Sequence, residues 1–177
     1  KRVIDRNTVP TPSNFYGNSK LQAEEGIKHL ESDDFKIVVL RPPMIYGKGS
    51  KGNYPRLANM AKKIPVFPDI ENERSMLHVD NLCEFIKVMI DHEETGLFFP
   101  QNSEYVNTSE MVRLIGEVHG KKIWMISWMN WLIRLMFGIG VVNKVFGNLV
   151  YEKSMSDYDK ANYRIRTFRE SIELTER

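Results

Sequence analysis

The sequence predicts an α/β fold, because a helix-forming segment and an apolar strand follow each other closely near the start of the chain. Residues 15–30 are rich in helix-forming side chains, with apolar residues near helical spacing. Residues 35–40 form a short apolar run, typical of a strand buried on both faces of a parallel sheet, and Arg41-Pro42-Pro43 ends it. A helix, a buried strand and a loop at the end of that strand make half of a doubly wound unit, in which ligands bind beyond the strand ends.

The remaining helices and strands are predicted from residues that cap helices and residues that end them. The polar residues 1–13 read as a loop, with Ser13 or Asn14 as the N-cap of the first helix. Asp80 is expected to cap a later helix, and the Thr167–Glu170 pattern resembles a capping box that opens the last one. The full set comprises helices over 53–63, 80–92, 110–119, 128–137, 141–146 and from 167, and extended segments over 64–68, 75–79, 97–99 and 121–126.

The glycine-rich loop 47–52 connects the first strand region to the helix that begins at Asn53. Three glycines make this loop flexible, and Lys48 and Lys51 make it basic. It is either a solvated surface loop or a loop that faces a phosphate group.

Bulk composition excludes several classes of function. The chain has 177 residues, a net charge of +2 and no long basic run, so nothing indicates a nucleic-acid partner. The single Cys83 cannot form an internal disulfide, which fits a reducing compartment. The apolar stretch 123–142 is about long enough to span a bilayer, but its central Arg134 would be costly there. We interpret it as a strand and amphipathic helices, with a membrane-surface role as the alternative.

Tyr16 and Lys20 are the candidate chemical pair. Residues four apart lie one turn apart on the same helical face. An ammonium near a phenol favours the phenolate and lowers the phenol's pKa. A phenol tuned in this way can pass a proton at neutral pH, as hydride transfer on a sugar hydroxyl requires. The pair alone could also occur by chance on a solvated helix.

Three segments strengthen the case for chemistry. They are Asn-Phe-Tyr-Gly-Asn-Ser-Lys-Leu-Gln-Ala-Glu at 14–24, Arg-Pro-Pro-Met-Ile-Tyr-Gly at 41–47 and Arg-Ser-Met-Leu-His-Val-Asp-Asn-Leu at 74–82. In this order and spacing they resemble the extended short-chain dehydrogenase/reductase superfamily, and most closely its NAD-dependent epimerase/dehydratase family of nucleotide-sugar enzymes. The resemblance runs over nearly the whole chain and is strong up to about Asp91.

The resemblance implies a fold with two parts. Residues 1–47 would form the C-terminal part of a dinucleotide-binding domain with a doubly wound, Rossmann-like parallel sheet. Residues 48–177 would be mostly a small mixed α/β substrate-binding domain, with some segments returning to the sheet. The family's Gly-x-x-Gly-x-x-Gly loop, which anchors the dinucleotide, has no counterpart here, so we expect this chain to be a C-terminal fragment without turnover of its own.

The resemblance also implies catalytic and cofactor-binding roles. Tyr16 would exchange the proton of the sugar hydroxyl, and Lys20 would hold the nicotinamide ribose hydroxyls and keep Tyr16 acidic. Pro43 would lie beside the nicotinamide. The implied cofactor is NAD, with NADP as the alternative.

Substrate contacts are implied at three further positions. Met44 stands where many epimerases of the family have an Asn that contacts the nucleotide-sugar. Asn53 resembles a residue that hydrogen-bonds the substrate, and Arg74 resembles an arginine that pairs with its diphosphate. No metal site is expected, since His78 and Asp80 have no further ligand at suitable spacing.

The resulting functional hypothesis is an isomerase of the UDP-glucose or UDP-N-acetylglucosamine 4-epimerase type, acting through a 4-keto sugar. A nucleotide 4-keto-sugar reductase or dehydratase is the alternative within the family, and a non-catalytic substrate-binding or dimerising module is the alternative outside enzymes. The resemblance further implies a cytoplasmic homodimer in carbohydrate metabolism, with a UDP-linked sugar as substrate and no membrane partner. Trp124, Trp128 and Trp131 are expected in the core or at a subunit contact.

Overall fold

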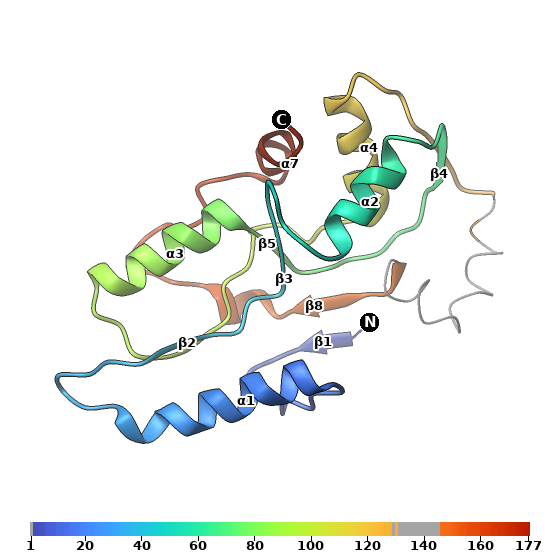
Figure 1. Ribbon diagram of the computed structural model, residues 1–177. Coiled ribbons are helices and arrows are strands. Elements are labelled where there is room, and N and C mark those ends of the chain that lie inside the picture. The colour runs from blue at the N-terminus through green and yellow to red at the C-terminus, as the bar shows by residue number, and fades with distance from the viewer. Residues whose placement is uncertain (1, 129, 131–145) are drawn as a thin grey trace.

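The structure is a computed structural model that describes residues 2–128, 130 and 146–177 (Figure 1). Its strands are three residues long and pair in parallel as β1 with β8, β2 with β6, β3 with β5, and β4 with β7. They are β1 Arg2–Ile4, β2 Val38–Leu40, β3 Met44–Tyr46, β4 Val66–Pro68, β5 Met76–His78, β6 Gly96–Phe98, β7 Trp124–Ile126 and β8 Leu149–Tyr151. The prediction of an α/β fold with parallel strands is confirmed.

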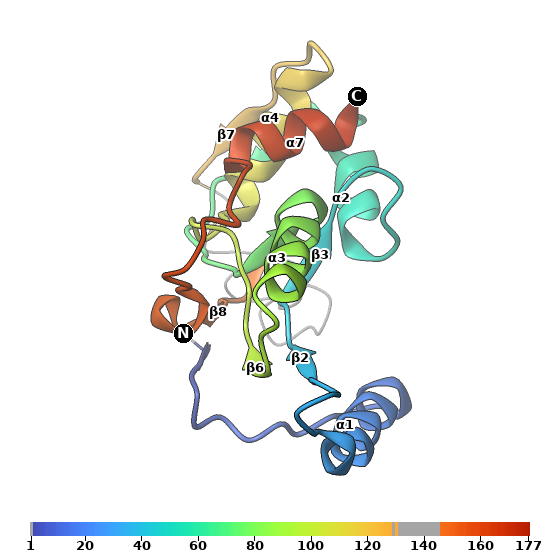
Figure 2. The same cartoon turned by 90° about the vertical axis from the view of Figure 1, so that its left-hand side faces the viewer.

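The described helices lie at the two opposite ends of the molecule and in the region between them (Figures 1 and 2). They are α1 Phe15–Ile27, α2 Asn53–Ala61, α3 Val79–Asp91, α4 Thr108–Val118 and α7 Phe168–Glu176, with 3-10 turns η1 Lys28–Leu30 and η3 Lys153–Ser156. Figures 1 and 2 both show α1 at one end and α2, α4 and α7 together at the other, with α3 and strands between them. None of the described helices is long and apolar enough to cross a membrane.

Helix α1 begins where the sequence predicts. The side chain of Asn14 accepts a hydrogen bond from Gly17 N at 2.8 Å, which satisfies one of the free amides of the first turn. No residue of α1 is buried. The helix therefore draws little stability from packing within the described part of the chain.

Residues 1–13, predicted as a loop, contain strand β1, and the predicted strand over residues 35–40 is less buried than expected. β2 is confined to Val38–Leu40, and all three of its residues are half-buried rather than buried. Phe35, at the start of the apolar run, is 55% exposed. Within the described residues, β6 alone pairs with β2, so β2 is an edge strand there.

The predicted N-cap of α3 is also wrong by two residues. Strand β5 runs directly into α3, and His78 is the cap, with Nδ1 accepting from Asp80 N at 3.3 Å. Asp80 instead lies in the first helical turn, where its carboxylate faces the positive end of the helix dipole. It accepts a hydrogen bond from Arg166 Nε at 3.0 Å.

Two hydrophobic clusters hold the fold together. The larger joins α2, α4 and α7 to β3, β4 and β5, around buried residues such as Tyr46, Met111 and Ile172. The smaller centres on Phe85 of α3 and Tyr163. Trp124 and Trp128 belong to neither, since they are 59% and 73% exposed, which overturns a core position for both. Trp131 lies outside the described residues.

Candidate active site

Tyr16 and Lys20 lie on one exposed face of α1. The Lys20 ammonium nitrogen is 5.5 Å from the centroid of the Tyr16 ring, so the two side chains lean together along the helix. Tyr16 is 70% exposed, and Lys20 is exposed as well. The pair is therefore open to a ligand that approaches α1 from this side.

The same face of α1 is tied to the end of β2 by an ion pair. Glu24, one turn beyond Lys20, accepts two hydrogen bonds from Arg41, at 3.0 Å from Nε and 2.7 Å from Nη2. The Glu24 side chain is only 10% exposed and that of Arg41 26%. A bidentate pair of this kind fixes direction as well as distance, so it orients α1 against the loop that follows Leu40. Pro42 and Pro43, both half-buried, continue that loop.

Three residues predicted to contact the substrate converge on one cavity. Met44 opens β3, Asn53 is the first residue of α2, and Arg74 precedes β5. Their side chains line a cavity of about 490 Å³, a size typical of small-molecule sites. The full lining is Met44, Asn53, Tyr54, Arg56, Leu57, Met60, Arg74, Met76, Val106, Thr108 and Met111.

Arg74 supplies a half-buried cation to this cavity. Its backbone exchanges hydrogen bonds with Val106, at 3.0 and 2.8 Å, which fixes the start of the side chain. Its Nη1 donates to the carbonyl of Gly147 at 3.0 Å. Burial lowers the pKa of the Arg74 guanidinium, because the charged form loses solvation. An anion bound beside it would restore part of that lost solvation.

The cavity walls include residues that sequence reasoning missed. Three further methionines, at 60, 76 and 111, join the predicted Met44 in an apolar and adaptable lining. Arg56 adds a second cation. A usable signal was present in α2, where the lining residues Asn53, Arg56, Leu57 and Met60 follow helical spacing.

The loop 47–52 joins β3 to α2. Gly47 packs so closely against α3 that a Cβ there would lie 2.4 Å from Val79 Cγ1, which explains a glycine at this position. Gly52 precedes α2 with φ of 109° and provides no side-chain cap. Lys48 and Lys51 are exposed, so the loop is basic where it leads into Asn53.

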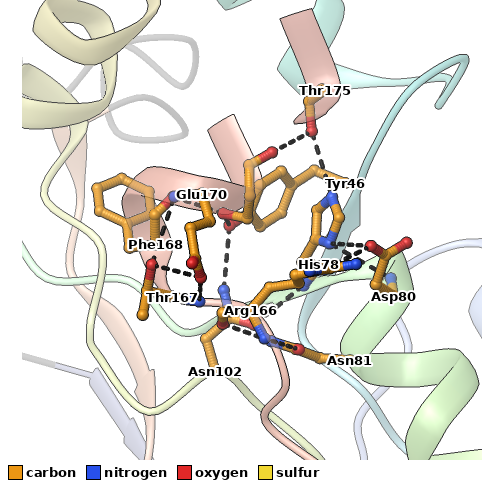
Figure 3. Close-up of polar contacts among 11 residues, drawn as sticks. Tyr46, His78, Asp80, Asn81, Asn102, Arg166, Thr167, Phe168, Glu170 and Thr175 are labelled. Carbon is orange, nitrogen blue, oxygen red and sulfur yellow. Dashed lines mark hydrogen bonds and ion pairs between the residues drawn. The ribbon is translucent and has the colours of Figure 1, made fainter. Parts of the chain in front are cut away.

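A buried polar junction holds β3 in place behind the cavity (Figure 3). The Tyr46 hydroxyl lies 2.5 Å from Ser171 Oγ and accepts from Asn102 Nδ2 at 3.1 Å. Asn102 Oδ1 in turn accepts from His78 N at 3.0 Å and from Asn81 Nδ2 at 2.9 Å. Burial raises the pKa of Tyr46 to about 12, so this phenol stays protonated and acts as a structural group.

His78 and Asp80 are engaged in structure rather than in a metal centre. His78 Nδ1 is 4.0 Å from Asp80 Oδ2, and Asp80 also binds Arg166. Within the described part of the chain, no group of three or more His, Cys, Asp and Glu residues is placed to hold a metal ion.

Solved structures support the fold. UDP-glucuronic acid 4-epimerase from Bacillus cereus, determined in complex with NAD, superposes with a TM-score of 0.66 at 14% identity, covering 98% of this chain and 54% of that one. At this identity the likeness establishes the Rossmann-like α/β fold alone.

Curated proteins and a family model give the closer relationship. UDP-glucose 4-epimerase from Vibrio cholerae is 30% identical over 148 residues, which cover 78% of this chain and 45% of that protein. An N-acetyl-α-D-glucosaminyl-diphospho-ditrans,octacis-undecaprenol 4-epimerase from Escherichia coli O157:H7 is 29% identical over 70% of this chain and 39% of its own length. The chain thus spans less than half the length of these relatives. The model of the NAD dependent epimerase/dehydratase family matches residues 2–99, and the chain belongs to that family.

Proposed function

We propose that the chain carries the catalytic pair and the substrate side of an NAD-dependent nucleotide-sugar 4-epimerase, with NADP as the alternative cofactor. The observation that carries the proposal is the position of Tyr16 and Lys20 on the face of α1 that the Glu24–Arg41 pair fixes to the loop after β2. That loop reaches the substrate cavity at Met44, three residues after Arg41.

The roles follow from the chemistry of the side chains. Tyr16 acts as a phenolate that the Lys20 ammonium stabilises: it takes the proton of the sugar C4 hydroxyl, becomes the phenol, and returns that proton in the reverse step. The exposed Tyr16 and Lys20 offer hydrogen-bonding groups, and the half-buried Pro43 offers an apolar contact. Together they fit the nicotinamide ribose end of NAD. When bound, NAD supplies the hydride acceptor and donor for sugar C4.

The cavity supports a nucleotide-sugar as substrate. The Arg74 guanidinium is a planar fork that matches phosphate oxygens, and its partial burial strengthens the attraction to a diphosphate. Asn53 offers an amide for the same group, while the methionine lining provides apolar contact that tolerates different sugars or bases. A UDP-linked hexose such as UDP-glucose or UDP-N-acetylglucosamine is the proposed substrate.

The test uses the protein expressed from its complete reading frame. Incubation with NAD and each UDP-sugar, followed by chromatography, should show conversion at C4. Tyr16→Phe should lower kcat by roughly a hundredfold or more, since it removes the proton-transferring group. Tyr158→Phe is the matched control, because this hydroxyl contacts Glu94 and His92 rather than the site. Full activity in Tyr16→Phe would reject the role assigned to Tyr16.

Met44 favours a second candidate, a nucleotide 4-keto-sugar reductase. In many epimerases of the family an Asn stands at this position, and a thioether cannot replace the hydrogen bonds of an amide. Oxidation of NADH or NADPH by a nucleotide 4-keto-sugar, with no interconversion of UDP-sugars, would favour the reductase over the epimerase.

We also propose that the enzyme is a cytoplasmic homodimer that pairs through α1. The helix buries none of its residues within the described part of the chain, and Phe15 is 87% exposed. Side chains of this kind are usually covered in an assembled protein. Sedimentation of the complete protein as a monomer would contradict this.

The 177-residue chain by itself is expected to show no turnover. It contains no Gly-x-x-Gly-x-x-Gly sequence to anchor the pyrophosphate of a dinucleotide. A spectrophotometric assay of the isolated chain should show no reduction of NAD with UDP-sugars. Measurable turnover would contradict the prediction.

A further inference from the structure

We propose that the surface around Trp124 binds an anionic lipid bilayer at the level of its headgroups. This surface, called here the Trp124 surface, consists of Val66, Lys121, Lys122, Trp124 and Trp128. It shares no residue with the catalytic pair or the substrate cavity. The inference therefore stands or falls independently of the proposed activity.

The pairing of β4 with β7 creates the apolar part of the surface. Val66 and Trp124 are register partners and point to the outer face, where they are 45% and 59% exposed. The next residue of β4, Phe67, points inward and is 3% exposed. Trp128 follows four residues after Trp124 and is 73% exposed. Two indoles and a valine, from β4, β7 and the residues directly after β7, are thus exposed to solvent.

Cations flank the indoles. The Lys122 ammonium lies over the Trp124 ring, 4.1 Å from its centroid. Beside it is a recess of about 470 Å³. The recess is lined by Arg113, Glu117, Gly120, Lys121, Lys122 and Ile123.

The charges of the recess leave two lysines for an anion. Arg113 pairs with Glu110 and Glu117, which neutralises the carboxylate of the recess. Lys121 donates to the carbonyl of Lys62 at 2.9 Å. Among the residues that the structure describes, neither Lys121 nor Lys122 forms an ion pair with a carboxylate. The recess therefore suits the phosphate of a lipid headgroup.

The combination of exposed tryptophans and lysines favours a bilayer over a second copy of the chain as the partner of this surface. Tryptophan is enriched at membrane interfaces, where the ring is apolar and its N–H stays wet, and lysines are attracted to anionic headgroups. A two-fold contact would bring together two copies of a surface that carries the same positive charge, which is unfavourable. A shallow contact also needs no spanning helix, and none is present among the described residues.

The experiment is vesicle flotation of the protein expressed from its complete reading frame. Vesicles of phosphatidylcholine with phosphatidylglycerol should carry the protein, and vesicles of phosphatidylcholine alone should carry much less. Tryptophan emission should shift to the blue on binding, and added salt should weaken it, because part of the attraction is electrostatic.

Matched variants test the surface itself. Trp124→Ser with Trp128→Ser should lower the bound fraction about tenfold or more, and Lys122→Glu should lower it on anionic vesicles. The controls are Ile90→Ser and Lys87→Glu on α3, where Ile90 is 70% exposed and the Lys87 side chain 64%. Both controls should bind as the unmodified protein does. All variants should keep their thermal midpoint and their turnover of soluble substrate.

Three results would overturn the proposal. The first is an absence of binding to anionic vesicles. The second is an equal loss of binding in the surface variants and the α3 controls. The third is a change in sedimentation of the Trp124 or Lys122 variants without a change in vesicle binding, which would identify the surface as a contact between copies. If the tryptophan variant does not fold, Lys122→Glu decides the question alone.

Discussion

The guanidinium of Arg74 combines partial burial with a position at the wall of the proposed substrate cavity. A cation in that setting keeps much of its attraction for a phosphate, because less water screens it. Its Nη1 donates a hydrogen bond to the carbonyl of Gly147, which directs the guanidinium.

We therefore expect Arg74→Gln to raise KM for the nucleotide-sugar by about 10- to 100-fold, the range for losing a hydrogen bond to a charged group. A smaller change in kcat is expected if the contact is equal in ground and transition states. Steady-state kinetics on the complete protein measures both. Arg169→Gln, which alters an exposed arginine paired with Glu117 at 3.1 Å, is the control. An unchanged KM in Arg74→Gln would remove this residue from the site.

At the level of elements, the bidentate pair between Glu24 and Arg41 fixes the orientation of α1 relative to the end of β2. Since α1 buries none of its residues, this pair is a main fixed contact between α1, which carries the proposed catalytic pair, and the strand that leads to the cavity. Glu24 is a positioning residue, because it acts through α1 and Arg41 rather than on the substrate.

Glu24→Gln should lower kcat more than it changes KM, because a misplaced proton donor slows chemistry without removing substrate contacts. Arg41→Lys should have a similar effect, since an ammonium cannot form the two parallel bonds. Glu25→Gln, on the exposed side of the same helix, is the control. If Glu24→Gln and Glu25→Gln behave alike in kcat, the ion pair does not position Tyr16.

Local signals predicted most of the elements correctly. The capping box at Thr167 and Glu170 is present, and Asn107 caps α4 through Glu110 N at 2.9 Å. Such caps involve neighbours in the chain, so a sequence pattern is enough to find them. The cap of α3 was missed because strand β5 passes straight into the helix and leaves His78, an uncommon cap, at the boundary.

Long-range contacts were predicted less well. Met44, Asn53 and Arg74 were named from a family resemblance, and their convergence on one cavity depends on tertiary packing. The Glu24–Arg41 pair joins residues 17 apart with no local pattern to signal it. Burial was misjudged for β2, Trp124 and Trp128 because apolar character alone does not say whether a neighbouring element covers a side chain.

At the level of the whole molecule, the buried imidazole of His78 links stability to pH. Burial is the main cause that lowers the pKa of His78, with Arg166 acting in the same direction and Asp80 in the opposite one. The neutral ring accepts from Asp80 N through Nδ1, and Nε2 lies 3.4 Å from Thr175 Oγ1 of α7. A proton on Nδ1 would remove the acceptor that caps α3.

The direction of the change in stability follows from comparing the pKa of His78 in the folded and the unfolded protein. Below the ordinary value of 6.5 the unfolded chain binds a proton that the folded protein does not yet accept. The free energy of unfolding should therefore fall as the pH drops from that value to the lowered pKa of the folded state. One proton limits the slope to ~1.4 kcal/mol per pH unit.

Urea unfolding over a pH series measures this effect. His78→Asn should remove this part of the pH dependence, because an Asn can cap the helix without titrating. His29→Asn, at an exposed position, is the control. The same slope in His78→Asn as in the unmodified protein would contradict the assignment.

The buried polar junction also has a consequence for how the chain folds. Its contacts join segments that are far apart in sequence, up to the 125 residues between Tyr46 and Ser171. Closing loops of that length costs chain entropy before any bond forms, so such contacts slow folding. Helix α7 must dock before the Tyr46 hydroxyl can reach Ser171, which makes the packing of this helix a natural late step. A nascent chain would then complete this junction only after α7 has left the ribosome.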